Sequence, residues 1–298
     1  MGYSIFCEHF SKDRLLFDAP MSEYTSFKIG GPADLMVMPV NSEEVQKAVD
    51  LCKASGLPYF VMGKGSNLLV KDSGVRGVII NLSKYLESYE FIDDLTLKAG
   101  AGITLAKLAG IAADKGLEGL EFASGIPGSL GGAVYMNAGA YDFEMKDVLV
   151  SATVLCGDGR EKIMDTNDMA LGYRSSVFQK SAHIILDATV KLMLGDKDKI
   201  REKMLELNGR RKEKQPLDLP SGGSTFKRPE GHFASKLIDD CGLKGFSIGG
   251  AKVSEKHAGF VVNYNQATAC DVIAVMDHVR EKVFKEFGVT LVAEIEII

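Results

Sequence analysis

The chain has 298 residues, enough for two domains or three small ones, and its 46% hydrophobic and 25% charged content is typical of a soluble globular protein. Its 40 acidic and 35 basic residues give a net charge of −5, which provides no basic surface for nucleic acid or an anionic membrane. No apolar stretch approaches the roughly 18 residues of a membrane-spanning helix, and the N-terminal residues lack a signal peptide's apolar block. We therefore expect a cytoplasmic protein that binds no nucleic acid and enters no membrane.

The cysteines and histidines do not form a recognisable metal or disulfide pattern. The five cysteines are scattered without a C-x-x-C pair, and the five histidines have no H-E-x-x-H spacing. We therefore expect neither a disulfide framework nor a metal site, and we interpret the cysteines as small buried hydrophobic residues.

The first third of the chain alternates strand and helix signals. Residues 41–56 predict a helix with an Asn41 cap, Glu44 at the capping-box position and a Gly56 stop. "PYFVM" (58–62) and "GVRGVIINLS" (74–83) predict strands, and "GKGSNLLV" (63–70) predicts a loop that leads into an extended stretch. This first unit covers roughly residues 20–85.

A similar alternation follows. "LTLKAGAG" (95–102) predicts a strand and residues 104–116 a helix, and later "DVLVSATVL" (147–155), a "GDGR" turn and "HIILDATVKLML" (183–194) predict further strands. Residues 196–216 predict a charged connector helix that Pro216 terminates. The remainder predicts an α+β unit: a strand at 257–263, a helix at 268–287 and a closing strand at 289–298. The helix has a core side, for which we expect Val272, Val275, Met276, Val279, Val283 and Phe287.

Two uncharged, glycine-bearing stretches suggest a phosphate-bearing ligand. "GIPGSLGGAVYMNAGA" (125–140) holds five glycines, too many for an ordinary core helix, and "GKGSN" (63–67) holds two. Backbone N–H groups approach an anion closely where no Cβ intervenes, so two such loops can bind a dinucleotide diphosphate. Neither is a P-loop, and "GKGSNL" and "GAGITL" both place leucine at the third glycine of the Rossmann pattern. The alternative is that both are tight turns.

Three further features carry candidate chemistry. "SGGSTFKRP" (221–229) combines glycines for close approach, a hydroxyl that carries a proton and two cations, or it is a polar turn between domains. "GYRSS" (172–176) places one arginine in a neutral segment, where the alternative is a surface ion pair. In "LVAEIEII", alternation places Glu294 and Glu296 on one strand face, and the alternative is that both face solvent.

Together these features resemble one family, UDP-N-acetylenolpyruvoylglucosamine reductase, the MurB flavoenzymes of peptidoglycan precursor synthesis. Seven stretches carry the resemblance, in family order from about residue 24 to the end: "YTSFKIGGPAD", "GKGSNLLV", "SGIPGSLGGAVYMNAGAYD", "GYRSS", "SGGSTFKRP", "GLKGFSIGGAKVSEKHAGFVVN" and "AEIEII". One such motif is weak evidence, whereas seven in register are strong. The spacing after "GYRSS" leaves no room for the insertion of the longer branch, so the chain resembles the shorter, type II branch.

The resemblance implies an α+β fold with two subdomains that clasp FAD, of the vanillyl-alcohol-oxidase (PCMH) type, and a C-terminal α+β substrate-binding domain. On this basis we expect FAD-binding subdomains at residues 1–85 and 86–200 and a substrate-binding domain at 201–298. An alternative is that the last strand packs back on the FAD-binding domain.

The resemblance also implies the ligand of the two glycine-bearing stretches, a non-covalently bound FAD. Carried over position by position, its contacts are Gly63, Gly65, Ser66, Asn67, Leu68, Gly125, Ile126, Pro127, Gly128, Ser129, Asn137 and Gly139.

The implied reaction is reduction of an enolpyruvyl ether on UDP-N-acetylglucosamine to UDP-N-acetylmuramate. NADPH reduces the flavin and leaves, the substrate takes its place, and hydride passes to the distal vinyl carbon. Negative charge then develops toward the carboxylate, so the reaction needs a cation there and a proton donor at the adjacent carbon. Ser224 matches the family's proton donor, and Arg174 and Glu294 match the pair that holds and polarises the carboxylate.

The resemblance implies four substrate contacts and shows two departures. The contacts are Tyr173, Lys214, Lys227 and Arg228. The usual "FKNP" reads "FKRP", so Arg228 replaces a neutral contact and either strengthens diphosphate binding or points away. "LVAEIEII" lacks the Glu and Pro that commonly precede the glutamate assigned to Glu294.

We thus expect a cytoplasmic, monomeric, NADPH- and FAD-dependent oxidoreductase of cell-wall synthesis, hence of cell shape and division. Two alternatives remain open. One is another FAD oxidoreductase of the same cofactor fold, and the other is a nucleotide-sugar-binding module that lacks flavin and catalysis.

Overall fold

The computed structural model describes residues 2–298, which form two compact units. Unit 1 comprises the described residues up to Phe17, Leu35–Lys64 and Gly77–Arg210. Unit 2 comprises Asp18–Asp34, Gly65–Arg76 and Arg211–Ile298. Each unit is therefore assembled from three separate segments of the chain, and the expected division at residues 85 and 200 stays a prediction.

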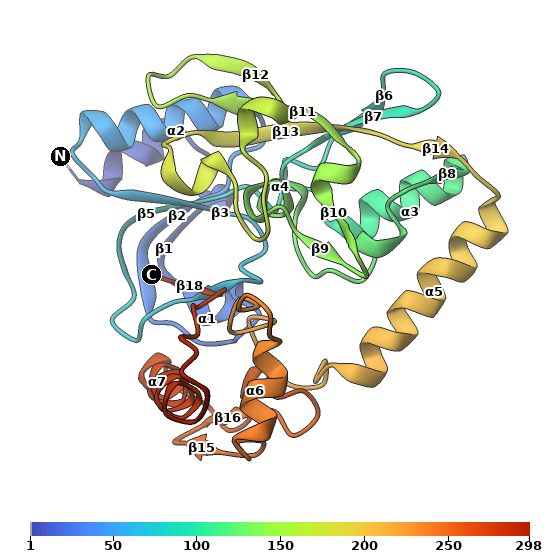
Figure 1. The fold of residues 1–298 in the computed structure, drawn as a ribbon. Coiled ribbons are helices and arrows are strands. Elements are labelled where there is room, and N and C mark those ends of the chain that lie inside the picture. Colours follow the sequence, from blue (N-terminus) through green and yellow to red (C-terminus); the bar gives the residue numbers. More distant parts are fainter. Residues whose placement is uncertain (1) are drawn as a thin grey trace. The chain divides into compact units, whose positions relative to one another are not determined.

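Unit 1 is built around a five-stranded antiparallel sheet in the order β12-β11-β13-β7-β6 (Figure 1). Its strands are β6 (Tyr89–Phe91), β7 (Thr96–Gly100), β11 (Leu149–Leu155), β12 (Glu161–Asp165) and β13 (Ile184–Lys191). β11 and β12 form the hairpin expected around "GDGR", in which Gly159 has a φ of +87°. A second sheet has the order β1-β2-β5-β3, with strands β1 (Leu15–Pro20), β2 (Pro32–Val37), β3 (Tyr59–Met62) and β5 (Val75–Asn81).

The helices of unit 1 begin and end where the sequence carries capping residues. α2 (Ser42–Ala54) starts after Asn41, whose side chain accepts a hydrogen bond from the Glu44 amide. α3 (Leu105–Lys115) starts after Thr104 and ends at Gly116, which has a φ of +78°. Both predicted helices are confirmed. The remaining elements are η1 (Tyr3–Glu8), η2 (Lys12–Arg14), β8 (Leu117–Glu118), η3 (Glu121–Ala123), β9 (Gly139–Ala140), β10 (Phe143–Glu144), η4 (Met145–Asp147), η5 (Thr166–Met169), η6 (Val177–Lys180) and β14 (Met193–Leu194).

The glycine-rich stretch is not wholly a loop. Residues Leu130–Met136 form the helix α4, which packs against β7 and β13. We had expected that so many glycines would exclude a core helix, and this was wrong. A Cβ on Gly131 would lie 2.8 Å from the Ala101 Cβ, so glycine is what allows this helix to approach its neighbour.

Unit 2 contains a three-stranded antiparallel sheet, β15-β16-β17, against which the long helix α7 packs. The elements of this unit are α1 (Met21–Tyr24), β4 (Leu68–Leu69), α6 (Ala234–Asp240), β15 (Ser247–Ile248), β16 (Ala251–Val253), β17 (Val261–Asn263), α7 (Ala269–Phe287) and β18 (Glu296–Ile297). A capping box of Thr268 and Asp271 starts α7. The expected core side of this helix is buried except for Phe287, its last residue, which is 39% exposed and precedes the Gly288 turn. The connector helix α5 (Lys197–Lys214) is confirmed.

The predicted closing strand over 289–298 is largely wrong, because that segment changes partners. Lys227 donates its backbone N–H to Val292 O, and Glu294 donates its own to Thr225 O. Only β18 then pairs with β4, in parallel, with Glu296 opposite Leu68. Because β4 has only two residues, its ladder with β18 has only two residue pairs. The C-terminal segment therefore bonds two different parts of the chain, the segment around Thr225 and then β4.

The free energy of unfolding should depend on pH through the half-buried carboxyl group of Glu296. Burial raises its pKa above the ordinary value, so the folded state favours the neutral acid. The associated stability is present below the unfolded-state pKa, about 4, and is lost as pH rises through the folded pKa. Glu296→Gln is neutral at every pH. Its melting temperature should therefore gain on the wild type as pH rises above about 4. Parallel melting curves above that pH would contradict the burial effect.

Candidate functional site

One candidate site in unit 1 is a close approach between Gly63 and Ser129. A Cβ on Gly63 would lie 2.1 Å from the Ser129 Oγ. Ser129 is 2% exposed, and its Oγ is buried without a hydrogen-bond partner in the protein. Buried hydroxyls normally have partners, so an unpaired one beside a bare backbone indicates a group that meets a ligand. The two glycine-bearing stretches therefore do meet, at a point where a side chain would not fit.

Backbone hydrogen bonds fix the glycine-rich stretch beside β7. Gly131 donates to Ala101 O and Leu130 donates to Ile103 O, both at 2.8 Å, while Gly128 O accepts from the Leu105 amide at 3.0 Å. The expected cofactor contacts Gly125, Ile126, Pro127 and Gly128 precede this ladder in a turn that is half-buried to exposed. The turn is therefore held on a rigid base while remaining accessible.

Asn137 ends α4 in a left-handed conformation, with a φ of +42°, and is completely buried. Its side-chain amide donates to the Glu144 carboxylate at 3.0 Å and to Gly172 O at 2.9 Å, and its oxygen accepts from the Lys146 amide at 2.9 Å. All three side-chain partners lie within unit 1. The side chain thus joins the glycine-rich stretch to the turn that carries Arg174.

Arg174 is held next to the same stretch. Its Nη2 donates to Gly139 O at 2.8 Å, and its guanidinium lies 5.1 Å from the centre of the Tyr173 ring, which is 44% exposed. A Cβ on Gly139 would lie 2.4 Å from Phe143 O, so glycine is required by the tight β9–β10 pair. The structure therefore brings Arg174, Tyr173, Asn137 and Gly139 together in unit 1.

In unit 2, Asn67 connects the expected cofactor loop to the C-terminal segment. Its side chain donates to Glu294 O at 3.1 Å, and its carbonyl accepts from the Glu296 amide at 2.9 Å. Gly65, with a φ of +63°, and Ser66 both accept hydrogen bonds from Ser26. Leu68 lies in β4. The loop is thus fastened along its length, and through it Glu294 is positioned.

Ser224 lies beside a fully buried anchor, Thr225. The Thr225 amide donates to Gly259 O, its Oγ1 accepts from Val261 and its carbonyl accepts from Glu294. Ser224 itself is half-buried. Two of the three expected catalytic residues, Ser224 and Glu294, are therefore carried by directly hydrogen-bonded segments of unit 2.

The expected substrate-binding cations of unit 2 differ in their surroundings. Lys227 is half-buried, and Lys214 is exposed at the last residue of α5. The Arg228 guanidinium lies 4.6 Å from the centre of the Phe233 ring, and Phe233 is 59% exposed. An aromatic face orients a guanidinium without consuming its hydrogen-bond donors, so this stacking gives the Arg228 head group a defined orientation.

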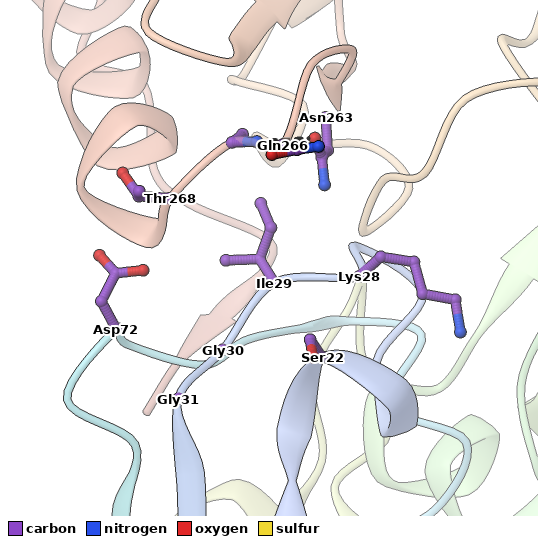
Figure 2. Close-up of a pocket in the computed structure, with 10 residues that line it drawn as sticks. Ser22, Lys28, Ile29, Gly30, Gly31, Asp72, Asn263, Gln266 and Thr268 are labelled. Carbon is purple, nitrogen blue, oxygen red and sulfur yellow. Dashed lines mark hydrogen bonds between the residues drawn. The ribbon is translucent and has the colours of Figure 1, made fainter.

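A separate open pocket of about 510 Å³ lies within unit 2 at the start of α7 (Figure 2). Its lining includes none of the expected site residues, and its polar groups have protein partners: the Asp72 carboxylate accepts from Ala269 and Cys270, and the Asn263 side chain bonds Phe27 and Ala267. Figure 2 shows the Lys28 ammonium pointing away from Asp72. These groups are occupied in stabilising the helix start.

The sequence analysis assigned no role to Gln179 or to Ser176, and both bond the end of α4 from the segment that follows Arg174. Ser176 is the last residue of "GYRSS", and the only sequence signal for Gln179 is proximity to that motif, which does not distinguish it from other polar residues there.

Within residues 2–298, no group of His, Cys, Asp or Glu is arranged to hold a metal ion. Over the same residues, every helix is too short or too polar to traverse a bilayer.

Models of known protein families match both parts of the chain. Residues 33–165 match an FAD binding domain, and residues 215–298 match the C-terminal domain of UDP-N-acetylenolpyruvoylglucosamine reductase. The expected FAD-binding fold and C-terminal domain are thereby confirmed.

Curated relatives match along nearly the whole chain. A UDP-N-acetylenolpyruvoylglucosamine reductase of Clostridium perfringens is 48% identical over 99% of this chain and 97% of its own length. One from Clostridium botulinum is 49% identical over 96% of this chain and 93% of its own.

Solved structures agree. The crystal structure of the reductase (MurB) from Thermus caldophilus has a TM-score of 0.81 at 35% identity, covering 95% of this chain and 97% of that one. An alkyldihydroxyacetonephosphate synthase, at 19% identity and a TM-score of 0.50 over 65% of this chain and 41% of that one, shares the fold alone. The chain belongs to the UDP-N-acetylenolpyruvoylglucosamine reductase family.

Proposed function

We propose that this chain reduces the enolpyruvyl ether of UDP-N-acetylglucosamine to UDP-N-acetylmuramate, with FAD as cofactor and NADPH as reductant, in peptidoglycan precursor synthesis. The observation that carries the proposal is identity of 48% along 99% of the chain with a reductase of that name, which covers both the FAD-binding and the C-terminal parts. We further propose a cytoplasmic monomer.

The residues at the Gly63–Ser129 approach fit a diphosphate-bearing cofactor. An unpaired buried hydroxyl and a bare backbone offer neutral donors at short range, which is how an anion is held without a compensating cation. When bound, FAD supplies the hydride that it has taken from NADPH. We assign its binding to both glycine-bearing stretches, with the residues expected from the sequence: Gly63, Gly65, Ser66, Asn67, Leu68, Gly125, Ile126, Pro127, Gly128, Ser129, Asn137 and Gly139. For Asn137 the assignment is to its backbone, since its side chain is satisfied within the protein.

Arg174 and Glu294 are proposed to hold the enolpyruvyl carboxylate. Hydride addition at the distal vinyl carbon leaves negative charge that spreads onto this carboxylate, and a fixed guanidinium stabilises that charge most where water is excluded. A glutamate beside a carboxylate must be protonated or closely paired with a cation.

Ser224 is proposed to deliver the proton to the carbon adjacent to the carboxylate. A serine hydroxyl is a weak acid, so it serves only when the acceptor carbon is strongly basic and its own position is fixed. The buried Thr225 beside it, bonded by its amide, hydroxyl and carbonyl, gives that fixed position. Four residues are proposed to bind the remainder of the substrate, namely Tyr173, Lys214, Lys227 and Arg228.

Gly63→Ala tests the cofactor assignment. The added Cβ would meet the Ser129 Oγ at 2.1 Å, so either the hydroxyl must turn away or the two stretches must separate. Either change disturbs the group assigned to the cofactor, and the affinity for FAD should fall by at least about tenfold. The measurement is visible flavin absorbance per mole of purified protein. Gly110→Ala in α3, where a Cβ meets nothing within 4 Å, is the matched control and should keep its flavin. A wild-type protein that stays colourless with added FAD would instead support a binding module without flavin.

Ser224→Ala tests the proton donor. Bleaching of the flavin by NADPH should keep the wild-type rate, while turnover of the enolpyruvyl substrate should fall by about 10²–10⁴-fold, as for loss of a positioned acid. Ser247→Ala, at an exposed position of β15, is the matched control and should leave both rates unchanged. Near-normal turnover in Ser224→Ala would remove Ser224 from the mechanism.

A further inference from the structure

Arg174 has a backbone conformation that its surroundings must maintain. Its φ is +48°, in the left-handed region that arginine seldom adopts, within a tight turn where Gly172 and Ser175 exchange backbone hydrogen bonds of 3.0 and 3.2 Å. Such conformations persist only where neighbouring groups hold them, and they are concentrated at functional sites. The question is which group holds this turn.

The side chain of Gln179 makes the relevant contacts. It lies in η6, and its Nε2 donates to Arg174 O at 3.2 Å and to Tyr135 O at 3.3 Å, with the Met136 Sδ at 3.4 Å. Tyr135 and Met136 are the last residues of α4. The carbonyl groups in the last turn of a helix have no N–H donor within the helix. One carboxamide therefore bridges the backbone of Arg174 to the end of the helix in the glycine-rich stretch.

The other end of Arg174 is fixed to the same stretch. Its guanidinium donates to Gly139 O at 2.8 Å, three residues beyond the end of α4. The arginine is thus held at its carbonyl through Gln179 and at its head group through Gly139. Both attachments belong to one rigid segment, so a change at Gln179 would alter where the guanidinium is presented.

Two neighbouring hydrogen bonds, from Ser176 and Asn137, are less specific to Arg174. Ser176 Oγ donates to Tyr135 O at 2.6 Å and Asn137 donates to Gly172 O, so each of these bonds holds the turn through a residue other than Arg174. Asn137 is also completely buried among further partners, so its loss would disturb the core. Gln179 is only partly buried, and its donors serve the turn and the helix end.

We infer that Gln179 is a positioning residue for the reduction step: it sets the orientation of Arg174 toward the enolpyruvyl carboxylate and has no part in the reaction of NADPH with the flavin. The inference rests on the proposed function of Arg174. It adds a residue that acts through the arginine and touches neither substrate nor cofactor.

The test is a double-mutant cycle on the FAD-loaded enzyme with Gln179→Met and Arg174→Lys. Methionine keeps the length of the side chain and removes both donors. In Gln179→Met, kcat/KM for the enolpyruvyl substrate should fall by about 10- to 100-fold with an unchanged rate of flavin reduction by NADPH. In the Arg174→Lys background, the same change should cost less than about twofold, because residues that act through one another are not additive.

Gln179→Glu gives a second, independent readout. The glutamate has the same size but faces two carbonyl oxygens with an acceptor at neutral pH, and it regains a donor when protonated. Its turnover relative to wild type should therefore rise as pH falls from about 8 to about 5. Gln46→Glu, a partly buried glutamine on α2, is the matched control and should follow the wild-type profile.

The outcomes separate this inference from the proposed function. Full additivity of the two changes, or wild-type kcat/KM in Gln179→Met, would overturn the positioning role and leave Arg174 in place. An equal loss in flavin reduction and in enolpyruvyl turnover would also overturn it, because it would indicate general disruption. Wild-type turnover in Arg174→Lys would instead overturn the proposed role of the arginine, and the inference with it.

Discussion

The close approach of glycine backbone to small neighbouring residues in unit 1 is the constraint on which the candidate site depends. Gly131 lies against Ala101 at a separation that leaves no room for a Cβ, and its amide bonds the Ala101 carbonyl. This contact places α4 on β7 and fixes the turn that precedes it. Gly63, from the other stretch, approaches the Ser129 side-chain hydroxyl at a separation that also leaves no room for a Cβ.

A site assembled from main chain has a characteristic electrostatic consequence. Its donors are neutral amides and hydroxyls, which hold a diphosphate by number and proximity and leave the net charge of the region unchanged. The guanidinium groups of Arg174 and Arg228 each lie against an aromatic ring. Such a ring orients a guanidinium without using its hydrogen-bond donors.

The sequence was most informative where local chemistry decides the structure. Asn41, Thr104 and Gly116 marked helix ends because capping satisfies backbone groups within a few residues. The helical character of residues 130–136 was missed because it depends on Ala101, a distant partner that allows glycines to pack. The short length of β18 was missed for the same reason, because it depends on distant partners. The last residues of the chain pair with β4, and the residues just before them bond the segment Thr225–Lys227.

The residues that position the site were harder to recognise than those that do its chemistry. Ser224, Arg174 and Glu294 stand in motifs, and a resemblance carries the roles proposed for such residues directly. Gln179 acts on neighbouring backbone outside any of the quoted motifs. Thr225 lies within "SGGSTFKRP", but its hydrogen bonds to neighbouring backbone could not be read from that pattern. Their role follows only from the groups that they contact. Gln179 donates to the carbonyl of Arg174, which has a left-handed backbone conformation. The Thr225 carbonyl accepts a hydrogen bond from the Glu294 amide. In both units, therefore, hydrogen bonds to the main chain hold the residues to which the chemistry is assigned.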